Sequence, residues 1–236
     1  MFKSLTAILG ICLLAGCNHQ ESSTQSSTPL TTEKDKASYS IGLNMGKQMA
    51  QIKDSIDFDR VKQGLNDAYN DAELKLTDDE IRASLTAFQQ QLQKTQAEKM
   101  KNAAATNKKA GDEFLATNKT AEGVKTTESG LQYKVITEGK GDTPKSTDTV
   151  VTHYKGTLID GTEFDSSYKR GQPATFPVTG VIKGWTEALQ KMKVGSKWQL
   201  FIPSDLAYGP RGAGKSIGPD SVLIFEIELL EIKKDA

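Results

Sequence analysis

The chain has 236 residues, of which 36% are hydrophobic and 25% charged, a composition typical of one or two modest globular domains. Its 30 basic and 30 acidic residues are spread so that neither half carries a large net charge, which argues against nucleic acid as a partner. One His lies beyond position 19 and no Cys beyond position 17. We therefore expect no disulfide, no cofactor and no metal site of the zinc, haem or iron–sulfur kind.

The first 17 residues are typical of an export signal. Lys3 precedes an apolar run from Leu5 to Leu14, which is too short to span roughly 30 Å of hydrocarbon as a permanent anchor. The run ends in Leu14-Ala15-Gly16-Cys17, which resembles the lipobox of bacterial lipoproteins. Cys17 would then be acylated and begin the mature chain, whereas the alternative is an ordinary secretory signal. The polar residues 18–32 are predicted to form a disordered tether.

Residues 33–76 are predicted to be a helical dimerisation domain. Thr32 can cap a helix that runs to about Ile52, and apolar and small residues cover more than half of its circumference. A lone surface helix needs only one buried stripe, so we expect this helix to have two neighbours, one of them in a second subunit. Packing within one subunit is the alternative. Asp57 can cap a second helix, from Phe58 onward.

A long connecting helix is predicted over residues 77–118. Thr77 and Glu80 form a capping box at its start, no Pro interrupts it, and Gly111 is its only Gly. Its first part carries an apolar stripe, but the side chains from Gln93 to Ala110 are polar or small on nearly every side. A helix of that kind usually crosses solvent between domains, so we interpret it as a spacer.

In residues 124–236 apolar residues recur at every second position, which is the period of β-strands. Strands are predicted around 131–135, at 149–158, at 162–164 after the turn Asp160-Gly161, and at 174–178, 196–202 and 221–232. One short helix begins near Gly184 and carries Trp185 on its apolar face. The fold class is therefore α+β, an antiparallel sheet wrapped on a short helix, preceded by the all-α region.

Conventional catalytic motifs are missing from this domain. It has no nucleophile elbow and no phosphate loop, and His153, without a second His nearby, is interpreted as an ordinary strand residue. Its distinctive feature is a set of aromatic residues in irregular places, with Asp165 directly after one of them: Tyr154, Phe164, Phe176, Trp185, Tyr208 and Phe225. Phe176 and Leu223 are assigned to the core.

Five segments resemble the FK506-binding-protein (FKBP) family of peptidyl-prolyl cis-trans isomerases, in the family's order and spacing. They are Val151-Thr152-His153-Tyr154-Lys155-Gly156, the segment from Asp160 to Ser167, Val181-Ile182-Lys183-Gly184-Trp185, Ala207-Tyr208-Gly209, and the segment from Leu223 to Leu229. The N-terminal half, with Asp35-Lys36-Ala37-Ser38-Tyr39-Ser40-Ile41-Gly42, resembles the bacterial macrophage infectivity potentiator (Mip) type. That type is a homodimer in which a long helix holds each isomerase domain away from the dimer region.

The resemblance implies a non-covalent isomerase with an apolar pocket. The residues that it assigns to catalysis are Asp165, which would face the twisting imide, Tyr208, Phe225 and Tyr154, and those it assigns to substrate binding are Phe164, Arg170, Val181, Ile182, Trp185 and Ile217. Trp185 would form the floor, the Ile182 N–H and the Tyr208 hydroxyl would bond substrate carbonyls, and Arg170 would orient Asp165. Ala174, Ala213, Ser216 and Gly218 depart from the small eukaryotic members, which bears on macrolide affinity and on the preference for the residue before proline.

The expected partners are proline-containing unfolded or exported polypeptides, a second copy of the chain, and a membrane bound through lipid. Macrolides of the FK506 and rapamycin type are expected inhibitors. The expected location is the cell envelope, at the outer membrane facing the periplasm, with exposure at the cell surface as the alternative. Two other functions compete with isomerisation: a non-catalytic binding module with a vestigial pocket, and a structural envelope lipoprotein.

Overall fold

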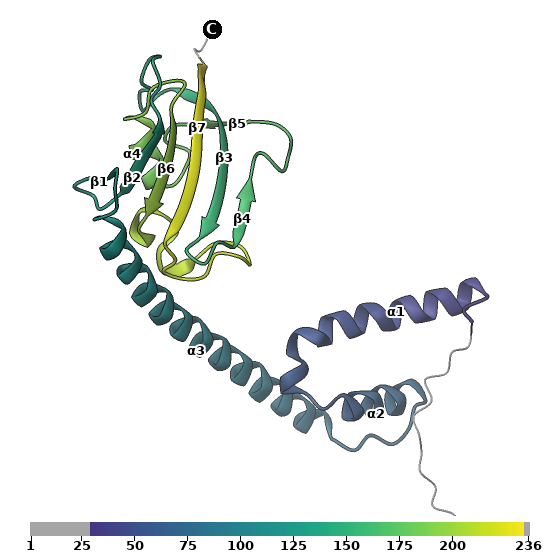
Figure 1. The fold of residues 1–236 in the computed structure, drawn as a ribbon. Coiled ribbons are helices and arrows are strands. Elements are labelled where there is room, and N and C mark those ends of the chain that lie inside the picture. The colour runs from purple at the N-terminus through teal and green to yellow at the C-terminus, as the bar shows by residue number, and fades with distance from the viewer. Residues whose placement is uncertain (1–28, 234–236) are drawn as a thin grey trace, which may run out of the picture. The chain divides into compact units, whose positions relative to one another are not determined.

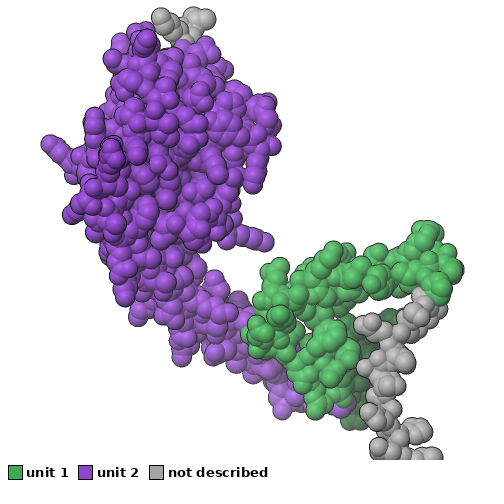
Figure 2. Space-filling model, in the orientation of Figure 1, with its two compact units in different colours: residues 1–74 green, residues 75–236 purple. Residues whose placement is uncertain are grey.

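The computed structural model describes residues 29–233, whose helices and strands are labelled in Figure 1. The export signal, Cys17 and most of the tether lie outside the described residues. The chain divides into two compact units, Met1–Leu74 and Lys75–Ala236 (Figure 2). Within residues 29–233, no helix is both long and apolar enough to cross a membrane.

The first unit contains α1 (Glu33–Met49), the 3₁₀ helix η1 (Ala50–Ser55) and α2 (Phe58–Tyr69). Thr32 caps α1 in a box with Asp35, whose N–H donates to the Thr32 hydroxyl over 3.1 Å, and Asp57 caps α2, as predicted. The predicted extent of the first helix was too long, because the α-helix ends at Met49 and Ile52 leaves the helical region with φ −123°.

The apolar side chains of this unit are uncovered in the single chain. Neither α1 nor α2 has a buried residue, and Tyr39 and Ile41 are 55% and 62% exposed. Burial of apolar surface is the main favourable contribution to folding, and these helices have little of it within the single chain.

The second unit begins with α3 (Asp78–Asn118), which the box between Thr77 and Glu80 caps as predicted. Its last turns pack on the sheet that follows. The rings of Phe114 and Phe201 lie 5.9 Å apart, and the Gln132 side chain donates to the Leu115 carbonyl over 2.9 Å. These contacts were not predicted from the sequence, which indicated only a spacer.

The sheet of the second unit has seven antiparallel strands. Six follow the order β1-β2-β6-β7-β3-β4, and β5 pairs with residues 149–152 at the start of β3. The strands are β1 (Val124–Thr126), β2 (Gln132–Thr137), β3 (Thr149–Leu158), β4 (Glu163–Ser166), β5 (Ala174–Pro177), β6 (Lys197–Ile202) and β7 (Leu223–Lys233). Short 3₁₀ helices, η2 (Ser204–Leu206) and η3 (Gly209–Arg211), follow β6. Only β1 was missing from the strands predicted by alternation.

Helix α4 (Lys183–Leu189) packs against one face of this sheet, as Figure 1 shows. Trp185 and Leu189 from the helix are buried, and they join inward-facing residues of the central strands, such as Val150 and Ile227, in one core. The α+β fold class predicted from the sequence is confirmed. The core leaves one end of α4 open, and the cavity of the next section lies there.

Candidate active site

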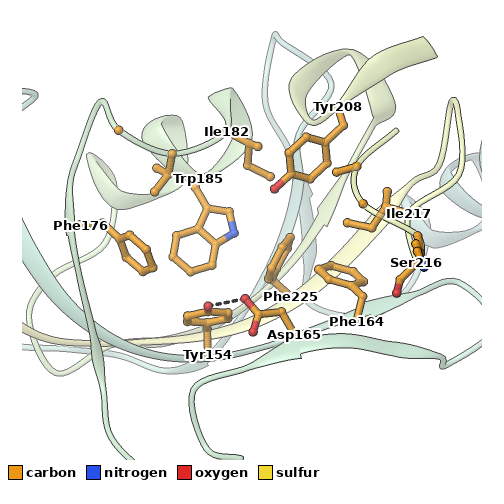
Figure 3. Close-up of a pocket in the computed structure, with 15 residues that line it drawn as sticks. Tyr154, Phe164, Asp165, Phe176, Ile182, Trp185, Tyr208, Ser216, Ile217 and Phe225 are labelled. Carbon is orange, nitrogen blue, oxygen red and sulfur yellow. Dashed lines mark hydrogen bonds between the residues drawn. The ribbon is translucent and has the colours of Figure 1, made fainter. Parts of the chain in front are cut away.

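A cavity of about 660 Å³ opens between the N-terminal end of α4, strands β3, β4 and β7, and the loop between β6 and β7 (Figure 3). This volume is typical of sites for small ligands or single side chains. Its wall is mostly apolar and consists of Tyr154, Phe164, Asp165, Phe176, Gly180, Val181, Ile182, Trp185, Tyr208, the segment 213–217 and Phe225.

Aromatic rings meet edge to face around Trp185, which is 4% exposed and stands at the centre of the cavity wall (Figure 3). Its ring centroid lies 5.2 Å from that of Tyr154, 5.2 Å from that of Phe225 and 5.8 Å from that of Phe176. Interplanar angles of 84–85° are the arrangement that aromatic quadrupoles favour. The rings therefore form a rigid apolar surface.

The wall depends on a residue without a side chain. A Cβ at Gly156, on β3, would lie 2.6 Å from the ring of Phe164 and 2.7 Å from that of Phe225. Real Cβ contacts are longer than this, so only Gly lets both rings pack against the strand. The glycine of the Tyr-Lys-Gly motif thus sets the width of the cavity on this side.

Asp165 is the acidic group of the cavity, and it is held by two donors. The Tyr154 hydroxyl donates to Asp165 Oδ2 over 2.5 Å, and Arg170 pairs with the other carboxylate oxygen. Arg170 also donates to the Tyr154 hydroxyl over 2.7 Å. The three side chains form a closed triangle at one edge of the aromatic wall.

Burial and hydrogen bonding act in opposite directions on Asp165. Partial burial disfavours its charge, but the hydrogen bonds from Tyr154 and Arg170 outweigh this and hold the pKa of Asp165 below its usual range. Burial, together with the bond to Asp165, raises the pKa of Tyr154. Near neutral pH Asp165 is therefore an anion and Tyr154 a neutral donor, so the triangle keeps one fixed protonation state.

Tyr208 stands on the opposite side of the cavity from Asp165 and points its hydroxyl into the open space (Figure 3). The residue is 41% exposed, and no hydrogen bond joins its hydroxyl to another described residue. A ligand in the cavity would thus meet a free donor on one side and a fixed carboxylate on the other, across an apolar floor.

Comparison with known proteins identifies this arrangement. Residues 140–230 match the model of the FKBP-type peptidyl-prolyl cis-trans isomerase, and residues 34–135 match the domain amino-terminal to it. The outer membrane protein MIP of Legionella longbeachae is 48% identical over 209 residues, 89% of this chain and 90% of that protein. This chain belongs to the FKBP-type peptidyl-prolyl cis-trans isomerases.

Two further relatives cover nearly the whole chain. The peptidyl-prolyl cis-trans isomerase Mip of Coxiella burnetii is 44% identical over 234 residues, 99% of this chain and all of that protein. The crystal structure of FkpA from Escherichia coli superimposes with a TM-score of 0.68 at 42% identity, covering 87% of this chain and 99% of that one. The resemblance to the Mip type seen in the sequence is therefore confirmed.

The FKBP pocket brings together nearly all of the residues that the family resemblance assigned to it. Nine of them line the cavity, and Arg170 stands behind the wall, where it contacts Asp165 and Tyr154. Phe176, which was assigned to the core, packs against the core through Tyr154 and Trp185 and also lines the cavity. Lys215 also lines it, although no motif in the sequence pointed to this residue.

His153 lies outside the cavity. It faces the other side of β3, where its ring stacks on Tyr168 at 4.6 Å and its Nδ1 lies 2.9 Å from the Ser167 hydroxyl. The Ser167 hydroxyl in turn bonds the Tyr154 backbone. In this FKBP domain His153 thus joins β3 to the turn that follows β4, which agrees with its interpretation as an ordinary strand residue.

Proposed function

We propose that this isomerase accelerates rotation about X-Pro bonds in exported proteins, with no covalent step and with chaperone activity toward unfolded chains. The supporting observation is the Trp185-floored apolar cavity with Asp165 and Tyr208 on opposite sides. Amide resonance sets a barrier of about 18–20 kcal/mol, and the twisted transition state has a less polar carbonyl than the planar ground state. An apolar, water-poor cavity therefore destabilises the twisted transition state less than the planar ground state, which lowers the barrier to rotation.

Different residues of the cavity would bind proline, bond the substrate carbonyls and face the twisting imide. The rings around Trp185 hold proline, while the Tyr208 hydroxyl and the Ile182 N–H bond substrate carbonyls on either side of it. Asp165, oriented by Arg170 and Tyr154, faces the twisting imide. An acceleration on the order of 10⁴ requires only about 5.5 kcal/mol, which positioning and desolvation can supply. Macrolides of the FK506 and rapamycin type would occupy the same cavity as inhibitors.

A lipid anchor at Cys17 would place this activity in the cell envelope. The proposal rests on the lipobox, on Asn18 in place of the Asp that retains lipoproteins at an inner membrane, and on the relative named an outer membrane protein. More than one acyl chain gives stable anchoring where one is marginal. Cys17→Ser is expected to release the protein from the membrane fraction and to remove the lipid mass. Retention in that fraction at unchanged mass would refute the anchor.

A homodimer formed through the first unit would bring two cavities to one client. The support is its large, exposed apolar side chains: Tyr39, Ile41, Leu43, Met45, Phe58, Leu65 and Tyr69. Two tethered sites can raise the effective concentration of the second one to the millimolar range, which matters for long unfolded chains and not for short peptides.

Deleting residues 18–92 is expected to give a monomer with nearly unchanged activity on peptides and slower proline-limited refolding of an unrelated protein. This fragment keeps the α3 turns that pack on the sheet, from Asn107 onward. The intact, unlipidated chain from Asn18 is the control, and both are compared by light scattering and by the two assays. A monomeric intact chain would exclude the dimer, and equal refolding rates would exclude the gain from two sites.

A further inference from the structure

The connecting helix reaches the loop that closes the cavity. Asn107, on α3, donates from its side-chain amide to the Pro219 carbonyl over 2.8 Å and to the Ser221 hydroxyl over 3.3 Å. The Ser221 hydroxyl donates in turn to the Gly218 carbonyl over 2.9 Å. Gly218 directly follows Ile217, which lines the cavity. A side chain more than 100 positions earlier in the chain therefore holds the backbone next to the cavity wall.

The rest of this loop has few polar attachments, although Ile217 packs against the core and Pro219 is buried. We call residues 209–221 the flap. Its internal bonds are a backbone bridge between Ala213 and Ile217, bonds from the Gly212 and Asp220 N–H groups to the Gly209 carbonyl over 3.3 and 2.9 Å, and the bond from Ser221 to Gly218. Within residues 29–233, Asn107 provides the only side-chain hydrogen bonds that reach the flap from outside it. The tip at 214–216 is exposed. Among the described residues, Asn107 is therefore the side-chain polar tie between the flap and the rest of the domain.

Close packing fixes Asn107 at this place. One turn further along α3, a Cβ at Gly111 would lie 2.7 Å from Val222 Cγ2, so the absence of a side chain lets the helix backbone approach the start of β7. Val222 is 5% exposed and Gly111 is buried. On the flap side, a Cβ at Gly218 would lie 2.8 Å from Asn107 Nδ2. The helix thus packs closely against Val222, just after the flap, and against Gly218 within it.

We propose that Asn107 is a positioning residue for the isomerase, which holds the flap so that Ile217 completes the cavity wall and couples the connecting helix to substrate binding. Asn107 does not line the cavity and makes no contact with Asp165 or Tyr154. Loss of the Asn107 side chain leaves Asp165 and Tyr154 unchanged but lowers the fraction of molecules in which the flap holds Ile217 against the cavity. An affinity that depends on a partly populated state falls in proportion to that population.

The test uses the full unlipidated chain with Asn107→Leu, which removes the donor, keeps a similar volume and favours the helix. We expect the KM for a proline-containing peptide to rise about 3- to 10-fold and FK506 to bind more weakly by a similar factor, with kcat within about twofold. Asn102→Leu is the matched control, because Asn102 is exposed on the same helix and its variant should retain wild-type values. Both are measured at a temperature at which circular dichroism shows them folded.

A second variant approaches the same contact from the flap. Gly218→Ala should push Asn107 away and raise KM, and the combined effect with Asn107→Ala should be clearly smaller than the product of the two single effects. Fully multiplicative effects would overturn the proposal. So would an Asn107→Leu variant that matches Asn102→Leu in KM and FK506 affinity, or one that lowers kcat with KM unchanged.

Discussion

Replacing Asp165 by Leu is expected to lower kcat/KM for a proline-containing peptide about 10- to 150-fold while the domain stays folded. Hydrogen bonds to a charged group are worth about 1.5–3 kcal/mol, and 1.36 kcal/mol corresponds to a factor of ten in rate. The loss should affect activity more than stability, because the Asp165 side chain is 43% exposed and solvent screens its pair with Arg170. The measurement is kcat/KM beside a thermal unfolding curve.

Two controls locate the effect in the carboxylate. Asp165→Asn keeps the shape and removes the charge, so its activity should lie between those of the wild type and of Asp165→Leu. Tyr208→Phe removes one neutral hydrogen bond and should cost only about 2- to 13-fold. If Asp165→Leu kept activity within twofold of the wild type, the carboxylate would have no part in the reaction and the assigned role would be wrong.

The pH profile gives a second readout of the same site. Because the hydrogen bonds from Tyr154 and Arg170 outweigh its desolvation, the folded pKa of Asp165 lies below its ordinary value of 3.8. A lowered folded pKa contributes stability above the unfolded pKa, and this contribution is lost as the pH falls through the folded pKa. Because Asp165 keeps its charge between about pH 6 and 8, the wild-type rate should be nearly flat over that range. A steep change in that window would indicate proton transfer by another group.

Local chemistry predicted the starts of the helices well. A capping residue and its partner lie within three or four positions of each other, so Thr32, Asp57 and Thr77 could be assigned without knowledge of the fold. The alternation of apolar and polar residues is also a local pattern, and it placed six of the seven strands. β1 has only three residues, Val124–Thr126, and shows too short a pattern for its period to be visible.

Contacts between distant segments could not be predicted in this way. Asn107 is one polar residue among many on α3, and its partners Pro219 and Ser221 lie more than 100 positions away. Phe176 alternates like a core residue and does pack against the core, but alternation gives no sign that it also lines the cavity. The pocket itself was located by the resemblance of five motifs to a family, since composition and spacing alone gave only a set of aromatic residues next to one Asp.

Replacing Trp185 by Ala is expected to destabilise the isomerase domain by about 3–5 kcal/mol and to abolish measurable activity. Large-to-small changes at buried aromatic residues cost this much, because contacts are lost and a cavity remains. Trp185 is 4% exposed, and its ring contacts those of Tyr154, Phe176 and Phe225 edge to face. The loss is a large part of the 5–15 kcal/mol that stabilises a typical domain.

Trp185→Phe separates the packing role from the polar one. The buried indole N–H has no hydrogen-bond partner among residues 29–233, so Phe loses ring area but leaves no bond broken. We expect Trp185→Phe to keep the fold and much of the activity, while Trp185→Ala lowers Tm by roughly 10–20 °C. Calorimetry and FK506 binding at low temperature measure both effects. If the two variants were equally stable and equally active, Trp185 would not be the floor on which proline packs.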